Sequence, residues 1–276
     1  MDRIRLIASD MDATLLDEQS QLPADFEETI HALAELGIRF APASGRPLYT
    51  LEAMFPTLRD ELVFIGDNGG AIRWKGQNLF TSEMSPEGWR ALNRLTREQG
   101  DIAVLCGLES AYVERPFAVH DAVLRHFYTK IEYVDRLEDV AAPADKFTIY
   151  LPQHNAQQAY DTVYASQRSI YSVAVAGECW VDIMNPGVHK GAALQTLGQL
   201  WGLPSESIMA FGDTYNDAEM LRTAKYGFLM ENGSVPLRRN VPFLAPSNRE
   251  AGVMQVLHRV LAQNGCVCPE DFVPAH

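Results

Sequence analysis

Apolar runs alternate with amphipathic stretches over roughly the first eighty residues. The runs at 4–8, 38–43 and 62–65 are mainly apolar, which is typical of strands that are buried on both faces of a parallel sheet. The stretches between them, 22–37 and 47–55, place apolar residues at helical spacing. Strands and helices therefore follow one another, and we expect right-handed crossovers between neighbouring parallel strands.

The same order returns near the end of the chain. It predicts a helix after Lys190, a strand at 208–212, a short helix around 220, a strand at 226–230 and a final helix at 252–261. Residues from Asn264 onward are predicted to form a terminal tail of uncertain order. The two ends of the chain together therefore favour one doubly wound parallel sheet.

The middle of the chain has a different pattern. Ser85 and Pro86 predict a helix start, and Gly100 predicts its stop. Beyond Gly100, β-like runs occur at 102–106, 112–114, 147–151, 169–174 and 179–183, and helix-like segments at 118–127 and 155–166. Strands mixed with helices in this way favour an α+β insert rather than a continuation of the parallel sheet.

The composition restricts the classes of function. Of the 276 residues, 47% are hydrophobic and 21% are charged, as in ordinary globular proteins. The formal charge of −13 argues against a nucleic-acid-binding surface and against binding to an anionic membrane. It also means that a site for an anionic substrate needs local positive charge from lysine, arginine or a metal ion.

No feature of the sequence predicts export or membrane insertion. Asp2, Arg3 and Arg5 interrupt any signal peptide, and no apolar run reaches transmembrane length. The four cysteines are scattered along the chain and do not form a disulfide framework. We therefore expect a cytoplasmic protein.

Acidic residues follow the predicted strands at both ends of the chain. Asp10 and Asp12 come after the first strand, Asp213 and Asp217 come after the strand at 208–212, and Lys190 precedes that strand. In open α/β sheets, ligands bind outside the carboxyl ends of the strands. A dense set of carboxylates there is a suitable site for a hard divalent cation such as Mg²⁺.

Each of these residues also has an ordinary structural interpretation. Asp10 and Asp12 also suit an Asx-type turn at a strand end. Asp217 is equally an acid favoured at the start of a helix, or shares a helix face with Asp213 if that helix begins early. Lys190 is equally a solvated lysine at a helix start.

The segment Ser44-Gly-Arg46-Pro47 follows the second predicted strand. A hydroxyl group and backbone N–H groups beside a glycine, just before a helix, form a ready anion-binding site. Capping of the helix by Ser44 is the structural alternative.

Four segments in order resemble the motifs of the haloacid dehalogenase superfamily, and most closely its Cof-type sugar-phosphate phosphatases. The segments are Asp10-Met-Asp12-Ala-Thr14, Ser44-Gly-Arg46-Pro47, Lys190-Gly191 and Gly212-Asp213-Thr-Tyr-Asn216-Asp217. The similarity extends to Asp67-Asn68-Gly69-Gly70, Met230-Glu-Asn232-Gly233 and Asn248-Arg-Glu-Ala-Gly252-Val253. It thus covers both arms of the predicted sheet.

The resemblance implies a fold and a division into domains. The fold would be α/β, a doubly wound Rossmann-like parallel sheet core with an inserted α+β cap domain. The core would be discontinuous, formed by residues 1–82 and 187–276, and the cap would span 83–186. By the same resemblance the cap determines which leaving group is accepted. Candidates to face the substrate are Glu178, Asp182 and Arg46, each of which is alternatively a surface charge.

The resemblance also implies a phosphatase with an aspartyl-phosphate intermediate. Asp10 would be the nucleophile, and Asp12 would protonate the leaving alcohol and then activate water. Crowding by like charges would keep Asp12 protonated. The implied phosphate-binding set is Thr14, Ser44, Gly45, Arg46, Lys190 and Asn216, with Ser44 and Lys190 also counted as catalytic. The implied Mg²⁺ ligands are Asp10, Asp12 through its backbone carbonyl, Asp213 and, in a supporting position, Asp217.

Ala13 departs from the family pattern, which has glycine at this position. If the position requires a positive φ, alanine is strained there; if it is helical or extended, alanine costs little. Two other functions therefore remain alternatives to a phosphatase. One is a phosphomutase of the same superfamily, and the other is a catalytically impaired protein with a metabolite-binding or regulatory role. The expected partners are small phosphorylated metabolites, with no nucleic acid and no membrane, and the expected state is monomer or homodimer.

Overall fold

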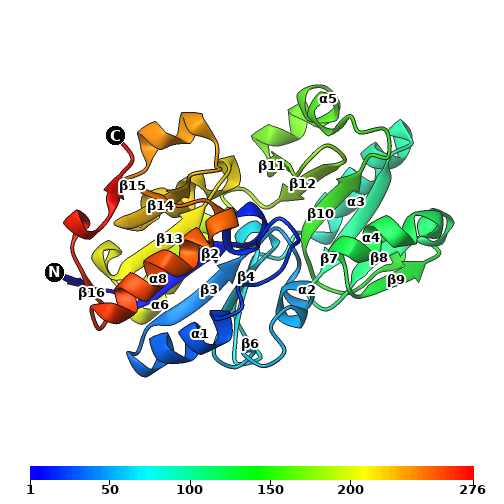
Figure 1. Cartoon of the computed structure of the whole chain (residues 1–276). Helices are drawn as coiled ribbons and strands as arrows, with labels where there is room; N and C mark the ends of the chain where they lie inside the picture. The colour runs from blue at the N-terminus through cyan, green and yellow to red at the C-terminus, as the bar shows by residue number, and fades with distance from the viewer.

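Two large β-sheets organise the computed structural model, which describes residues 1–276 (Figure 1). The larger sheet contains β2 (Leu6–Asp10), β3 (Arg39–Ala43), β4 (Val63–Gly66), β5 (Ala71–Trp74), β6 (Gln77–Thr81), β13 (Ile208–Gly212), β14 (Tyr226–Met230), β15 (Phe243–Ala245) and β17 (Val273–Pro274). The smaller sheet contains β7 (Ile102–Gly107), β8 (Ala111–Glu114), β9 (Ile131–Val134), β10 (Ala144–Tyr150), β11 (Ser172–Val175) and β12 (Trp180–Met184). A short pair, β1 (Asp2–Arg3) and β16 (Cys266–Val267), joins the two ends of the chain.

The larger sheet has the strand order β17-β15-β14-β13-β2-β3-β4-β5-β6. From β15 to β4 all neighbouring strands are parallel, while β5, β6 and β17 pair antiparallel with their neighbours. The chain leaves β2 toward β3 on one side and returns to its other side as β13. The carboxyl end of β2 is therefore the point where the strand order reverses, which is the usual place for a ligand site.

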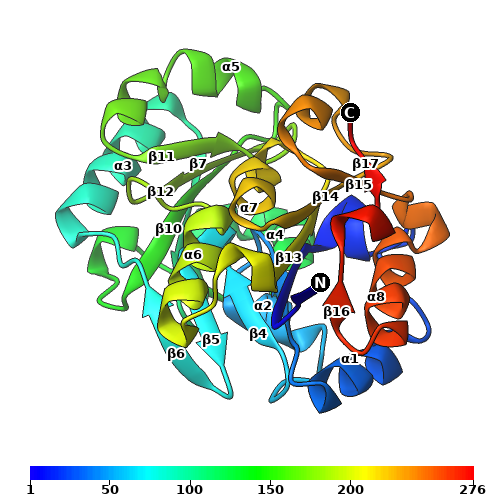
Figure 2. The ribbon, with the colours of Figure 1, turned by 90° about the vertical axis from the view of Figure 1, so that its left-hand side faces the viewer.

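Helices cover both faces of this sheet, as the alternation of side chains along the strands requires. On one face, Ile7 and Phe211 pack with α1 (Phe26–Glu35), α2 (Leu48–Ala53) and α8 (Gly252–Ala262). On the other face, Leu6 and Ala210 pack with α6 (Lys190–Trp201) and α7 (Ala218–Thr223), which lie in front of the sheet in Figure 2. Consecutive strand residues thus belong to opposite cores.

The smaller sheet has the order β11-β12-β10-β7-β8-β9. Its outer face packs against α3 (Pro86–Gln99) and α5 (Ala156–Asp161) through Trp89 and Phe147. Part of its other face packs against α4 (Asp121–Phe127) through Leu124 and Tyr128. Asn185 joins the two segments that connect the sheets, because its amide donates to Ser82 and to the carbonyl of Glu83.

The two large sheets are formed by different parts of the chain. All strands up to Thr81 and from Ile208 onward belong to the larger sheet or to the terminal pair, and all strands from Ile102 to Met184 belong to the smaller one. We therefore keep 1–82 with 187–276 as our interpretation of the core and 83–186 as that of the cap. No helix combines the length and the apolar character needed to cross a membrane.

Three parts of the sequence interpretation were incomplete or wrong. The hairpin β5–β6 was missed, although Lys75 and Gly76, both with positive φ, form the two-residue turn typical of hairpins. The strands β9 and β15 were also missed. The expected terminal tail is wrong, because β16 pairs with β1 and β17 pairs with β15 (Figure 2). Val267 and Phe272 are also buried in the core.

The packing of the C-terminal segment can be tested by truncating one buried side chain. Phe272 is 7% exposed and its ring contacts those of Tyr226, Phe228 and Phe243. Phe272→Ala should lower the free energy of unfolding by about 3 kcal/mol in urea titrations, because it leaves a cavity in this aromatic cluster. The neighbouring Val273 is 62% exposed, so Val273→Ala should change the free energy of unfolding by less than about 0.5 kcal/mol. Equal effects of the two variants would contradict the packing described here.

Candidate active site

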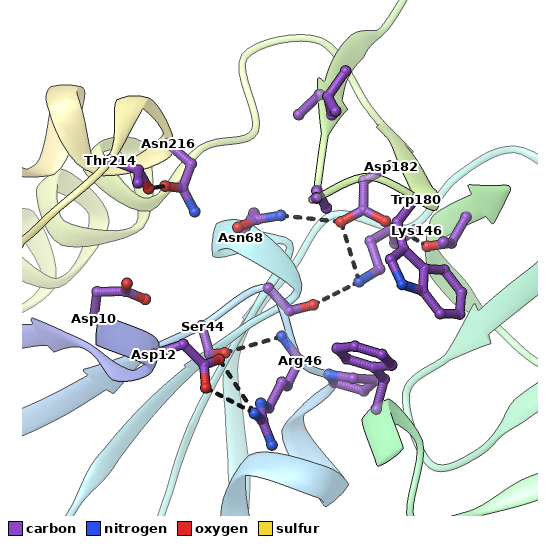
Figure 3. A pocket seen from close by; sticks show the side chains of 18 of the residues that line it. Asp10, Asp12, Ser44, Arg46, Asn68, Lys146, Trp180, Asp182, Thr214 and Asn216 are labelled. Atoms are coloured by element: carbon purple, nitrogen blue, oxygen red, sulfur yellow. Dashed lines mark hydrogen bonds and ion pairs between the residues drawn. The ribbon is translucent and has the colours of Figure 1, made fainter. Parts of the chain in front are cut away.

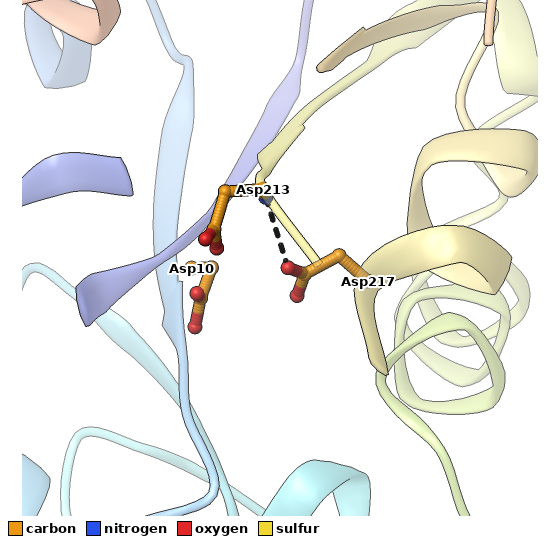
Figure 4. Close-up of side chains that lie close together, drawn as sticks. All are labelled: Asp10, Asp213 and Asp217. Atoms are coloured by element: carbon orange, nitrogen blue, oxygen red, sulfur yellow. Dashed lines mark hydrogen bonds between the residues drawn. The ribbon is translucent and has the colours of Figure 1, made fainter. Parts of the chain in front are cut away.

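Three carboxylates converge where β2 and β13 end, as Figure 4 shows. Asp10 is the last residue of β2, and Asp213 follows β13, its neighbour in the sheet. Asp217 lies in the turn that precedes α7, and its Oδ2 accepts hydrogen bonds from the backbone N–H groups of Asp213 (3.1 Å) and Thr214 (3.2 Å). Gly212 permits this approach, since a Cβ there would lie 2.4 Å from the Cβ of Asp217. The interpretation of Asp213 and Asp217 as two residues on one helix face is therefore wrong.

Lys190 at the start of α6 completes the cluster. Its ammonium donates to Asp10 Oδ1 at 2.5 Å and to Asp217 Oδ1 at 2.7 Å, and its side chain is fully buried. The interpretation of Lys190 as a solvated lysine is therefore wrong. Burial opposes its charge, but Asp10 and Asp217 outweigh burial and raise the pKa of Lys190 above its ordinary value.

One ammonium does not balance three buried carboxylates. Burial, followed by the charge of Asp217, raises the pKa of Asp10 well above its ordinary value, although Lys190 acts in the opposite direction. Burial and Asp217 also raise the pKa of Asp213 to about 6. The cluster therefore has an excess of negative charge that a divalent cation would neutralise, and oxygen ligands of this kind suit Mg²⁺.

The loop Met11–Leu15 carries the next candidates and holds Ala13 in the left-handed region, with φ 59° and ψ 8°. Two asparagines fix this loop: Asn232 donates to the carbonyl of Ala13 (2.8 Å), and Asn248 donates to the carbonyl of Leu16 (2.9 Å). The side chain of Thr14 is buried and donates to Asp213 (3.3 Å). The loop geometry thus includes the positive φ for which alanine is less suited than glycine.

The side chain of Asp12 points away from the three carboxylates. It is 57% exposed, and both of its oxygens accept hydrogen bonds from one nitrogen of Arg46, at 2.9 and 3.2 Å (Figure 3). The expectation that crowding by like charges acts on Asp12 is therefore wrong, because its neighbour is a cation. Arg46 instead holds the Asp12 carboxylate at the edge of the site.

The segment from Ser44 to Arg46 forms a compact loop before α2. The hydroxyl oxygen of Ser44 accepts a hydrogen bond from the backbone N–H of Arg46 (3.1 Å), and α2 begins after Pro47, so Ser44 does not cap that helix. Backbone bonds tie the loop to the turn after β4, from Asn68 N–H to the Ser44 carbonyl and from Asp67 N–H to the Arg46 carbonyl. Gly45 permits close packing of the Asn68 amide, which would lie 3.2 Å from an added Cβ.

Lys146 of the cap reaches this loop across the seam between the two sheets. A β-bulge at Asp145 directs both Asp145 and Lys146 toward the core. The Lys146 ammonium donates to the Gly45 carbonyl at 2.6 Å and pairs with Asp67 (2.9 Å) and with Asp182 (3.6 Å). Burial disfavours this ammonium, but Asp182 and Asp67 outweigh burial and raise the pKa of Lys146 well above its ordinary value.

A cavity of about 510 Å³ lies at this seam. Of the predicted site residues, those that line it are Asp10, Asp12, Ser44, Gly45, Arg46, Asp213 and Asn216. Thr14, Lys190 and Asp217 are buried behind its wall and contact it through Asp10 and Asp213. Asp182 lines the cavity as expected, whereas Glu178 does not; Glu178 is exposed and bonded to His154, so its candidacy is not supported.

Several residues of the site were not identified from the sequence. Asn68, Lys146, Thr148 and Trp180 line the cavity, and Asn232 and Asn248 support the first loop. A signal existed for Lys146 and Thr148, because they are polar residues at alternate positions of an apolar strand and must share one face of the sheet. The motifs that contain Asn68, Asn232 and Asn248 were noted, but their hydrogen bonds depend on the folded loops.

Comparisons with known proteins agree with this geometry. A family model described as haloacid dehalogenase-like hydrolase matches residues 7–257. The chain is 32% identical to the 5-amino-6-(5-phospho-D-ribitylamino)uracil phosphatase YbjI of Escherichia coli, over 94% of this chain and 96% of that protein. It is 31% identical to the HMP-PP phosphatase of Cronobacter sakazakii, over 87% and 89%. The crystal structure of SMU.1108c from Streptococcus mutans superposes with a TM-score of 0.84 at 29% identity, covering 94% of this chain and 99% of that one.

The positive φ of Ala13 generates a testable prediction. Ala13→Gly should raise the free energy of unfolding by about 1 kcal/mol, because glycine adopts this conformation without strain. Urea titrations would measure the gain. Ala122→Gly is the matched control: Ala122 is exposed within the helix α4, so the same substitution should destabilise there by about 1 kcal/mol.

The same variant separates strain in the loop from loss of catalysis. Because the asparagine contacts already hold the loop, we expect kcat/KM of Ala13→Gly to change by less than about tenfold. A much larger gain would support the hypothesis that alanine has impaired the enzyme.

Proposed function

The chain belongs to the haloacid dehalogenase-like hydrolases of the Cof type and is a phosphatase, and on this premise we propose that it depends on Mg²⁺ and forms an aspartyl-phosphate on Asp10. One observation carries the proposal. Asp10 faces the cavity at the reversal point of the sheet while its carboxylate is held from behind by the buried Lys190. A nucleophile is needed in this position, at the boundary between the cavity and the charged cluster.

The donor set of the cluster fits Mg²⁺. Asp10, Asp213 and Asp217 offer carboxylate oxygens within 4.8 Å of one another, and we propose Asp10, Asp213 and the backbone carbonyl of Asp12 as its ligands. Both oxygens of Asp217 already accept hydrogen bonds, from Lys190 and from two backbone N–H groups, so Asp217 supports the site from behind. Bound there, Mg²⁺ would offset the charge of the phosphoryl oxygens as a Lewis acid.

The chain's own residues would carry out two displacements. A carboxylate oxygen of Asp10 attacks phosphorus, the bond from phosphorus to the ester oxygen breaks, and that oxygen takes the proton of Asp12, which enters the step in its protonated form. Asp12 then removes a proton from a water molecule that attacks the same phosphorus and restores Asp10. The Ser44–Arg46 loop would bind the phosphoryl oxygens, while Arg46 positions Asp12 at the cavity edge. Lys190 would act through Asp10 rather than directly, because it does not reach the cavity surface.

The substrate is proposed to be a small phosphorylated metabolite. Sugar phosphates were expected from the resemblance, and the name of one relative adds a ribitylaminouracil phosphate as a candidate. These compounds define the panel in which phosphate release should be measured.

Replacing the nucleophile tests the proposed intermediate. Asp10→Asn should lower kcat on the order of a thousandfold or more, since the amide cannot form the acyl phosphate. Circular dichroism and thermal unfolding should show that the variant is folded. Asp60→Asn removes an exposed carboxylate outside the cavity and should leave kcat unchanged. Full activity in Asp10→Asn would refute the proposed chemistry.

The pKa of Asp213 gives a pH dependence with a defined sign. In the metal-free protein this pKa rises from 3.8 to about 6, so the neutral acid is favoured by folding. The stabilisation of the fold by the raised pKa of Asp213 is complete below about pH 4 and is lost as the pH rises through about 6. Mg²⁺ competes with this proton, so its affinity should fall as the pH drops below about 6.

Thermal unfolding with Mg²⁺ and with a chelator measures this competition. The rise in Tm that Mg²⁺ produces should be larger at about pH 7.5 than at about pH 5. In parallel, chelator should abolish phosphate release. A Mg²⁺ effect on Tm that does not change with pH would contradict the assignment of Asp213 as a ligand.

A further inference from the structure

The cavity contains few positive charges that are available to a ligand. Among all its lining residues only Arg46 and Lys146 are cationic, and no histidine lines it. A second anionic group on a substrate would therefore have to be bound by one of these two side chains or remain without a counter-charge.

Lys146 is fully engaged in holding the cap to the core. Its ammonium bonds to the Gly45 carbonyl and lies between Asp67 and Asp182, and all three side chains are buried. Asp67 and Asp182 lie 2.9 and 3.6 Å from this ammonium and are its ion-pair partners. Binding of a substrate anion would require Lys146 to leave at least one buried carboxylate unpaired, which is strongly unfavourable.

Arg46 is engaged as well. Its guanidinium bonds to both oxygens of Asp12, the residue proposed to exchange protons with the leaving group. A leaving group that recruited the same nitrogen of Arg46 would compete with Asp12. Both cations of the cavity are therefore already members of ion pairs.

The cap contributes one further charge to the cavity, and it is negative. Asp182 accepts hydrogen bonds from Thr148 (2.7 Å) and from Asn68 (3.3 Å), on the cavity side of the cap sheet (Figure 3). Its position opposite Thr148 in the β10–β12 pairing places it on the same face of the sheet. This carboxylate would repel an anion in the leaving-group part of the cavity.

The rest of the cap wall is uncharged and partly aromatic. Trp180 stands beside Phe127, Tyr128 and Tyr150, with ring centroids 5.0, 6.3 and 4.6 Å away. Of these rings, Phe127, Tyr128 and Trp180 line the cavity, together with small residues of the segment 174–177. Fixed aromatic rings of this kind pack favourably against a flat ligand surface.

We propose that the cap selects monophosphate esters whose leaving alcohol is uncharged and presents a flat face, and that it rejects leaving groups that bear a second phosphate or a carboxylate. The proposal rests on the proposed function and specifies its substrate class. The physical reason is that a second anion would lose its hydration in the cavity, face Asp182, and find no cation outside an existing ion pair.

Matched pairs of esters test the selectivity. The pairs are glycerol 3-phosphate with 3-phosphoglycerate, fructose 6-phosphate with fructose 1,6-bisphosphate, and uridine monophosphate with uridine diphosphate. Within each pair, kcat/KM for phosphate release should be at least about tenfold higher for the member with the uncharged leaving group. Equal or faster hydrolysis of the anionic members would overturn the selectivity.

The two proposals fail in different ways. If no ester of any pair is hydrolysed with Mg²⁺, the proposed function fails and the selectivity fails with it. If hydrolysis occurs and Asp10→Asn abolishes it, the proposed function holds, and the ratio within the pairs alone decides the selectivity.

Substitutions in the cap wall should change the ratio of kcat/KM between the uncharged and the anionic member of each pair. Ala176→Arg adds a guanidinium on the cavity wall, next to the strand that carries Trp180. It should raise kcat/KM for the anionic members relative to the uncharged ones by about tenfold. Gln158→Arg adds the same charge on an exposed face of α5 and should leave the ratio unchanged.

Asp182→Asn provides a second variant of nearly the same shape. It removes the cap carboxylate and leaves Lys146 with one fewer anionic partner, so the ratio should move in the same direction as in Ala176→Arg. Thermal unfolding identifies variants that do not fold. Unchanged ratios in folded forms of both variants would overturn the electrostatic basis of the proposal.

Discussion

The ammonium of Lys190, buried among the carboxylates at the ends of β2 and β13, is the interaction on which the site depends. It joins three parts of the chain that lie far apart in sequence: the strand end at Asp10, the start of α6 and the turn at Asp217. Removing one partner from such a buried pair leaves an uncompensated charge, which is strongly unfavourable. The excess negative charge that remains makes the same cluster a suitable place for a divalent cation.

A second buried lysine pairs with carboxylates at the seam between core and cap. Lys146 also lies among buried carboxylates, but its third partner is the carbonyl of Gly45 in the Ser44–Arg46 loop. Burial and Asp67 raise the pKa of Asp145 well above its ordinary value. Lys190 thus joins segments of the core to one another, whereas Lys146 joins the cap to the core.

The sequence was sufficient to predict the parallel sheet and the position of the carboxylates, because both depend on local signals. Apolar runs mark the strands, and Asp10 and Asp213 directly follow two of them. Asp182 was expected to face the substrate, but its contact with Lys146 could not be predicted, since the two meet only through the bulge at Asp145 and the register of antiparallel strands. The contact between Asp12 and Arg46 also depends on loop conformation, and Phe272 was missed because its partners lie in strands that are distant in sequence.

The position of β2 in the sheet has a consequence for the order in which the chain can fold during synthesis. Leu6 pairs on one side with Arg39 but on the other with Ile208, roughly two hundred residues later in the chain. A nascent chain that has emerged only through the cap therefore holds its first strands as a half-sheet with an open, apolar edge. Such edges associate with other chains, and long-range parallel pairing is slow. The cap, by contrast, closes its own sheet from a continuous segment, so it can be complete while the first strands of the core still lack their later partners.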